Sequence, residues 1–181
     1  SDPNLQLMAE GARQMGICNS CRYCEGYCAV FPAMERRLAF HATDLNYLAN
    51  LCHNCGECYY ACQYSPPHEF AINVPQLLGA IRAQSYKQYT WPASLAKLFD
   101  RNGLFVAVAL SLGIAGIFLL ATLVSGNGAA LTEAHPNGDF YTVIPHGAMA
   151  GLFGAVSLFV LAALIAGFMN FWRDAGENLA E

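Results

Sequence analysis

Apolar residues recur with helical spacing through the first half of the chain, and long uncharged runs replace this pattern in the second half. From Leu5 to Met15 an apolar residue returns every three or four positions. This spacing predicts a short helix over residues 1–17, which Gly16 ends. We expect this helix to pack over whatever the following residues bind.

Two further helical patterns follow before the uncharged runs. Residues 34–48 keep a period of three to four, and Thr43 or Asp44 can cap a short helix there. Pro75 can start another helix, whose apolar face continues to about Tyr86. No stretch alternates apolar and polar residues as a β-strand does. The sequence therefore predicts a mainly α fold.

Two uncharged runs are long enough to cross a membrane. The first, residues 104–124, would span about 30 Å as a helix, which matches the hydrocarbon core of a bilayer. The second covers about residues 146–171. Before them, residues 91–102 combine Trp91 with cations such as Lys97, which is typical of an interfacial amphipathic segment. A plain linker is the alternative for that segment.

Composition and charge support a membrane protein. Of the 181 residues, 12% are charged and 55% are hydrophobic, whereas a soluble domain carries about 25% charged residues. The net charge of −4 and the absence of a basic cluster exclude a nucleic-acid-binding surface. Lysine and arginine flank both runs on one side only, at Arg82, Lys87, Lys97, Arg101 and Arg173. The positive-inside rule then places both ends of the chain in the cytoplasm and the loop between the runs outside.

All eight cysteines lie before residue 63, in two copies of the pattern C-x2-C-x2-C-x3-C. Each cysteine of the first copy has a counterpart 34 residues later. Three cysteines at two-residue intervals can bind three corners of one [4Fe-4S] cube, and the fourth usually binds the other cluster. We therefore assign the first cluster to Cys18, Cys21, Cys24 and Cys62, and the second cluster to Cys52, Cys55, Cys58 and Cys28.

Structural zinc and disulfides are the competing interpretations of these cysteines. Structural zinc sites normally use two separated pairs of cysteines, and each run here has four crowded ones. Disulfide frameworks suit small secreted domains, whereas the charge pattern places this region in the cytoplasm. Iron–sulfur clusters remain the favoured interpretation.

These patterns divide the chain into three parts. Residues 1–90 form an all-helical, ferredoxin-like domain for two clusters, and residues 91–102 form the interfacial linker. Residues 103–181 form a transmembrane helical hairpin with an external loop. No nucleophile–base pair, nucleotide-binding loop or paired-carboxylate site is recognisable, so the sequence indicates electron transfer instead of substrate chemistry.

Several motifs together resemble the tricarballylate-utilisation protein B family, also called the citrate-utilisation protein B family. They are the paired cysteine runs, the stretch Pro66-Pro-His-Glu-Phe70, and the entry Ile144-Pro-His-Gly147 into a glycine-rich span that ends at Phe171-Trp-Arg173. The resemblance covers nearly the whole chain. The cysteine runs are generic among electron carriers, and the later motifs are more specific.

The resemblance implies a function and a set of partners. Such proteins reoxidise the reduced flavin of a soluble FAD-dependent dehydrogenase, which converts tricarballylate to cis-aconitate, and pass the electrons to membrane quinone. The location implied is the bacterial inner membrane, with several spans and lipid contacts. The alternatives are a redox sensor, a membrane anchor with structural clusters, and a quinone-linked subunit of another dehydrogenase or of cobalamin ring-contraction chemistry.

The family is also credited with a b-type haem. Family members usually continue through more membrane helices than this sequence contains. A bis-histidine haem needs two ligands at membrane depth, and the first span has no histidine. His146, at the outer end of the second span, can supply one ligand if the other lies on a helix outside this chain. The alternative is an interfacial histidine that caps the helix.

Overall fold

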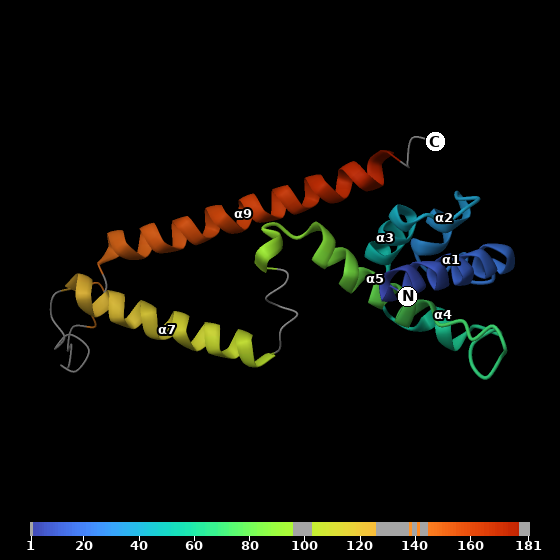
Figure 1. Cartoon of the computed structure of the whole chain (residues 1–181), viewed down its shortest axis with the longest axis horizontal. Coiled ribbons are helices and arrows are strands. Elements are labelled where there is room, and N and C mark those ends of the chain that lie inside the picture. The colour runs from blue at the N-terminus through green and yellow to red at the C-terminus, as the bar shows by residue number, and fades with distance from the viewer. Residues whose placement is uncertain (1, 96–102, 126–137, 139–140, 142–144, 178–181) are drawn as a thin grey trace. The chain divides into compact units, whose positions relative to one another are not determined.

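The computed structural model describes residues 2–95, 103–125, 138, 141 and 145–177. The described residues form helices and connecting turns, and none of them lies in a β-strand, which confirms the mainly α fold (Figure 1). Two compact units can be distinguished: residues 1–89 together with 168–181, and residues 90–167. Each unit is described by itself below.

The first helix, α1 (Pro3–Cys21), runs further than its sequence pattern indicated. Asp2 caps its start by accepting a hydrogen bond from the Asn4 amide at 3.0 Å. The prediction that Gly16 ends this helix was wrong. A glycine inside a helix costs about 1 kcal/mol relative to alanine but does not by itself stop it. The helix ends instead at Arg22, which adopts the left-handed conformation and donates its amide proton to the Cys18 carbonyl.

Two short helices replace the single pattern expected over residues 34–48. They are α2 (Val30–Glu35) and α3 (Ala42–Leu51). Leu38, which lies between them, is fully exposed, so its place in the apolar pattern was coincidental. Helix α3 begins after His41 and not at Thr43 or Asp44. Asp44 nevertheless stabilises the helix start, because its carboxylate accepts the His41 amide proton at 3.0 Å.

Helix α4 (Glu57–Tyr60) is a single turn, and α5 (Val74–Tyr89) is the longest helix after α1 in this part of the chain. Helix α5 packs against both α1 and α3. The core includes the fully buried apolar side chains Met15, Met34, Leu45, Leu48, Ile72, Leu78 and Ile81. Burying one such side chain contributes about 1.5–3 kcal/mol, so these helices hold the cysteine loops in fixed positions.

The remaining two helices are long and apolar. Helix α7 (Gly103–Ser125) and helix α9 (His146–Glu177) agree with the two spans predicted near residues 104–124 and 146–171. Each contains a stretch that is long and apolar enough to cross a membrane and that is not buried within the described chain. Large apolar residues such as Leu112, Phe118 and Phe159 are exposed along them. A helix that exposes apolar residues in this way suits a lipid environment.

Parts of the predicted organisation lie outside the described residues. This applies to residues 96–102 of the interfacial linker and to nearly all of the loop between α7 and α9. At the other end of α9, residues 168–177 belong to the same compact unit as α1 to α5. There the Tyr89 hydroxyl donates to the Asp174 carboxylate at 3.0 Å and accepts from the Asn46 amide at 3.3 Å.

Candidate metal centres

The first cysteine run begins inside a helix and continues in a loop. Cys18 and Cys21 lie on the last turn of α1, and the left-handed turn at Arg22 carries the chain away from the helix axis. Cys24 and Cys28 follow in the loop that leads to α2. This change from helix to loop lets three cysteines of one run face a common space.

The second run is arranged similarly around the end of α3. Cys52 follows the last residue of that helix, and Cys55 lies in the next loop. Gly56 then adopts a positive φ of 83°, a conformation that glycine accepts without strain. Cys58 lies in the single turn of α4, and Cys62 follows it. Both runs therefore begin at the carboxyl end of a helix.

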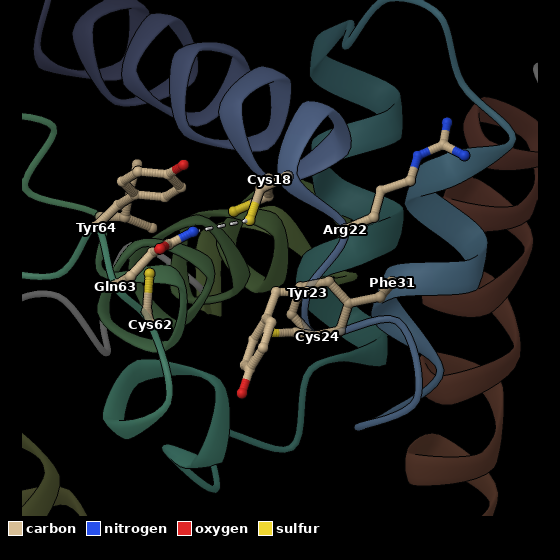
Figure 2. A pocket seen from close by; sticks show the side chains of 10 residues that line it. Cys18, Arg22, Tyr23, Cys24, Phe31, Cys62, Gln63 and Tyr64 are labelled. Carbon is tan, nitrogen blue, oxygen red and sulfur yellow. Dashed lines mark hydrogen bonds between the residues drawn. The ribbon is translucent and has the colours of Figure 1, made fainter.

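Four cysteines line the first of two hollows, which we call site 1. They are Cys18, Cys21, Cys24 and Cys62, the set predicted for the first cluster. Figure 2 shows that Cys18 comes from α1 whereas Cys62 comes from the segment that follows α4. Tyr23, Phe31 and Tyr64 complete much of the wall, together with Arg22, Gln63 and Ile72. The wall is thus mainly sulfur and apolar side chains.

The other four cysteines line the second hollow, site 2. They are Cys52, Cys55, Cys58 and Cys28, again the predicted set. Tyr27, Val30 and Phe31 close one side, and Val74 and Pro75 at the start of α5 also line the hollow. In both sites, the cysteine from the distant run lies with three cysteines of the other run. The fold therefore brings each predicted set of four to one hollow.

The two sites are neighbours. Phe31 lines both hollows and is only 2% exposed, so its ring is a shared wall. Cys24 in site 1 also contributes, after burial, to the raised pKa of the Cys58 thiol in site 2. Groups held in the two hollows would therefore lie close together, with little water between them.

Two N–H groups point at cysteine sulfurs. The amide of Asn54 donates to the Cys52 sulfur at 3.4 Å in site 2. The side chain of Gln63 donates to the Cys21 sulfur at 3.9 Å in site 1, and Figure 2 shows it reaching towards the sulfurs. Such hydrogen bonds stabilise negative charge on sulfur and influence the potential of a bound cluster.

Crowding makes free thiolates unfavourable in these hollows. Burial raises the pKa of the Cys18 thiol to about 12, and the nearby thiols of Cys62 and Cys24 add to the effect. Burial likewise raises the pKa of the Cys58 thiol to about 12, with Cys24 and Cys52 contributing. Thiolates at such positions need a compensating positive centre, which a metal supplies when it binds.

The donor set suits an iron–sulfur centre. All eight cysteines are free, which argues against a disulfide framework. Within the described part of the chain, no three His, Cys, Asp or Glu side chains lie close enough to share one metal ion. Zinc gathers its ligands around a single point, at about 2.3 Å for sulfur. A [4Fe-4S] cube takes one cysteine at each of its four iron corners and so holds the sulfurs further apart.

His146, the candidate haem ligand, is the first residue of α9 and is exposed. Its ring lies 5.4 Å from the ring of Tyr141. Its neighbour Pro145 precedes the helix and accepts the first amide protons, from Ala148 and Met149. His135 precedes it in the sequence and lies outside the described residues. His146 remains a candidate ligand on sequence grounds.

Sequence reasoning missed one residue beside the cysteines. Arg82 of α5 donates a hydrogen bond from Nη1 to the Cys52 carbonyl. Its charge was used in the sequence only to orient the chain in the membrane. Thirty positions separate the two residues, and no local pattern marks such a contact.

Comparison with known proteins gives consistent results. Residues 11–88 match the family model described as the citrate utilization protein B Fer4-like domain. Over 166 residues, which are 92% of this chain, the sequence is 48% identical to Citrate utilization protein B of Escherichia coli. The chain spans 43% of the length of that relative. No solved structure matches the chain. The Fer4-like match and the cysteine-lined hollows indicate an iron–sulfur electron-transfer role, and the chain belongs to the citrate utilization protein B family.

Proposed function

We propose that this protein carries single electrons from the reduced flavin of a soluble dehydrogenase to quinone in the membrane. The observation that carries the proposal is the pair of neighbouring hollows, each lined by four cysteines and separated by Phe31. A single storage or structural centre would need one such hollow. Two adjacent centres provide a relay, in a chain that also has two helices suited to a membrane.

In this proposal each hollow holds a [4Fe-4S] cluster, bound by the four cysteines that line it. The clusters supply one-electron chemistry, which divides the two electrons of a reduced flavin into single steps. The protein contributes the positions of the sulfurs, the buried wall at Phe31, and the hydrogen bonds to sulfur. Purified under anaerobic conditions, the protein should contain about eight iron and eight sulfide per chain. Stoichiometric zinc without sulfide would contradict the proposal.

The dehydrogenase partner is proposed from the family. The name of the Escherichia coli relative refers to citrate utilization, and the resemblance implies an FAD-dependent enzyme that oxidises tricarballylate to cis-aconitate. We propose a partner of this class, which acts on a small tricarboxylate. The flavoprotein that co-purifies with the intact protein would identify it.

We also propose that the cluster domain faces the cytoplasm. The support is the excess of Lys and Arg beside both spans on the domain side. The test is labelling of single added cysteines in intact cells with a reagent that does not cross membranes. Asn137→Cys in the loop should be labelled directly. Leu38→Cys, at a fully exposed position of the domain, should be labelled only after the membrane is opened; direct labelling would reverse the orientation.

The electron-relay function is tested with membranes that contain the protein, its flavoprotein and the substrate of that enzyme. Substrate should reduce the clusters within the turnover time, and added quinone should reoxidise them. Clusters that stay oxidised while the flavin is fully reduced would refute the relay and favour a sensor or structural role. Clusters that are reduced by substrate but not reoxidised by quinone would support the proposed flavoprotein donor and contradict the proposed quinone acceptor. A haem signal lost in His146→Ala would then indicate haem as the next carrier.

A further inference from the structure

Arg82 places a fixed positive charge beside site 2. Arg82 is half-buried, and its guanidinium donates to the carbonyl of Cys52, a residue that lines this site. The ion pairs among the described residues join Arg13 to Glu10 and Arg37 to Asp44, and neither involves Arg82. Its charge is therefore not cancelled by a described carboxylate.

The contact of Arg82 also offsets a negative end of a helix. Cys52 follows the last residue of α3, and the carboxyl end of a helix carries about half a negative charge. Because Arg82 binds a carbonyl at this end, it counteracts that field. The amino end of a helix carries about half a positive charge. Val74 and Pro75 lie at the amino end of α5 and line site 2, so this helix also places positive charge beside the site.

Site 1 has a weaker positive environment. It lies at the carboxyl end of α1, where Cys18 and Cys21 occupy the last turn. The cation there is Arg22, which donates to the Asn19 carbonyl at 2.9 Å. Arg22 is exposed, so water and salt screen its charge much more than that of a half-buried group. The Gln63 hydrogen bond to sulfur is long, at 3.9 Å.

Two side chains that can carry a charge near neutral pH, besides the cysteines, line site 2, and both are exposed. Glu57 carries a negative charge that opposes Arg82, and His53 can carry a positive one. Exposed charges contribute little beyond a few ångströms in salt solution. The Asn54 amide, which donates to the Cys52 sulfur at 3.4 Å, adds to the effect of Arg82. The balance at site 2 is therefore positive.

We infer that Arg82 raises the reduction potential of the site 2 cluster above that of the site 1 cluster. Reduction adds one negative charge to a cluster, and a fixed neighbouring cation stabilises that added charge. One electron then passes from reduced site 1 to oxidised site 2, past their shared wall at Phe31, with no bond made and no proton moved. This inference rests on the proposed function and assigns site 1 as the entry and site 2 as the collecting centre.

The first experiment is a potentiometric titration of the intact protein in detergent, followed by EPR. The Cys62→Ser and Cys28→Ser variants identify which signal belongs to site 1 and which to site 2. In the unaltered protein the site 2 signal should develop first as the potential is lowered. If the site 1 signal develops first, the inference is refuted, regardless of the midpoint potentials measured for variants of Arg82.

The second experiment is the same titration on Arg82→Gln, Arg82→Lys and, as a control at the other site, Arg22→Gln. Arg82→Gln should move the site 2 midpoint to a more negative potential and leave site 1 in place. Arg82→Lys, which keeps the charge, should restore most of that shift. Arg22→Gln should move the site 1 midpoint by less. A site 2 midpoint that is the same in Arg82→Gln as in the unaltered protein would refute the role of Arg82.

Neither experiment uses the flavoprotein or quinone. Chemical reductants and mediators set the potential, so the order of the two midpoints can be wrong while the relay to quinone is right. Conversely, failure of substrate to reduce the clusters would refute the proposed function and leave these midpoints unchanged. If Arg82→Gln loses iron from site 2, the order of reduction in the unaltered protein still decides the inference.

Discussion

Replacing Gly11 by alanine tests how closely α1 is packed against the helices that support the cysteine loops. A Cβ atom at Gly11 would lie 2.9 Å from Cδ1 and 3.3 Å from Cδ2 of Leu45, and 3.1 Å from Cδ1 of Ile81. Carbon atoms normally approach to about 3.5–4.0 Å. Leu45 and Ile81 are 1% and 0% exposed, so both side chains would have to shift inside the buried core.

A second glycine of the same helix provides the control. A Cβ atom at Gly16 would have no neighbour within 4 Å. In a helix, glycine to alanine contributes about 1 kcal/mol of stability through the backbone alone, and this term is common to both variants. Overpacking at Gly11 should cost about 1–3 kcal/mol. Gly11→Ala should therefore be less stable than Gly16→Ala by about 1–3 kcal/mol, whatever the exact backbone term.

The assay is hydrogen exchange of the intact, iron-loaded protein in detergent, read by mass spectrometry over α1, α3 and α5. Since each 1.4 kcal/mol is a factor of about ten, amides of α1 should exchange roughly 5- to 150-fold faster in Gly11→Ala than in Gly16→Ala. Because Cys18 and Cys21 lie on the last turn of α1, site 1 should also lose iron faster to a chelator. Equal exchange in the two variants would refute the packing argument.

Three further predictions follow from individual contacts. Cys62→Ser should remove the EPR signal of site 1 and Cys28→Ser that of site 2, each with loss of about four of eight iron atoms; the reverse pairing would refute the crossed ligand sets. Removing Arg37 leaves the buried Asp44 carboxylate without its oppositely charged partner, which lies at 2.6 Å. Arg37→Ala should therefore lower the free energy of unfolding by about 3–5 kcal/mol in denaturant unfolding; a change below about 1 kcal/mol would contradict this. Burial and a hydrogen-bonded carboxylate raise the pKa of Tyr89 to about 12, above about 10 for a free tyrosine, so its contribution to folding stability is complete below pH ~10 and is lost between pH ~10 and ~12. The tyrosinate absorbance that is missing from Tyr89→Phe should titrate with a midpoint near the raised pKa of Tyr89. A midpoint near the pKa of free tyrosine would refute the assignment.

Local features of the sequence were sufficient for the helical fold and for the chemistry of the cysteines. The spacing of cysteines within one run depends only on near neighbours, so it indicates a cluster loop without any knowledge of the fold. The two long helices follow from the absence of charge over residues 104–124 and 146–171, because composition alone decides whether a helix suits a membrane. The crossed pairing of the runs came from the motif and remains a prediction, with each predicted set of cysteines lining one hollow.

Helix ends were less predictable, because they depend on which local interaction prevails. Gly16 looked like a stop signal, yet α1 continues to Cys21 and ends at a left-handed Arg22. Leu38 fitted an apolar period but is fully exposed. A glycine can end a helix but does not have to, and a leucine at an apolar position of a helical period does not have to be buried. A weak backbone preference is readily overridden when the rest of the helix packs well.

The environment of the cysteines was decided by tertiary structure alone. Phe31 becomes a wall of both sites because α2, which carries it, packs against α1 and α3. Arg82 contacts Cys52 because α5 packs against α3. The sequence contains these residues but no signal for their contacts, since side chains thirty positions apart meet only when the helices that carry them are packed. The sequence by itself determined where the candidate metal-binding sulfurs lie along the chain and which segments suit a membrane. Only the tertiary structure decided which charges surround each site, because electrostatic interactions depend on distance and burial and not on order along the chain.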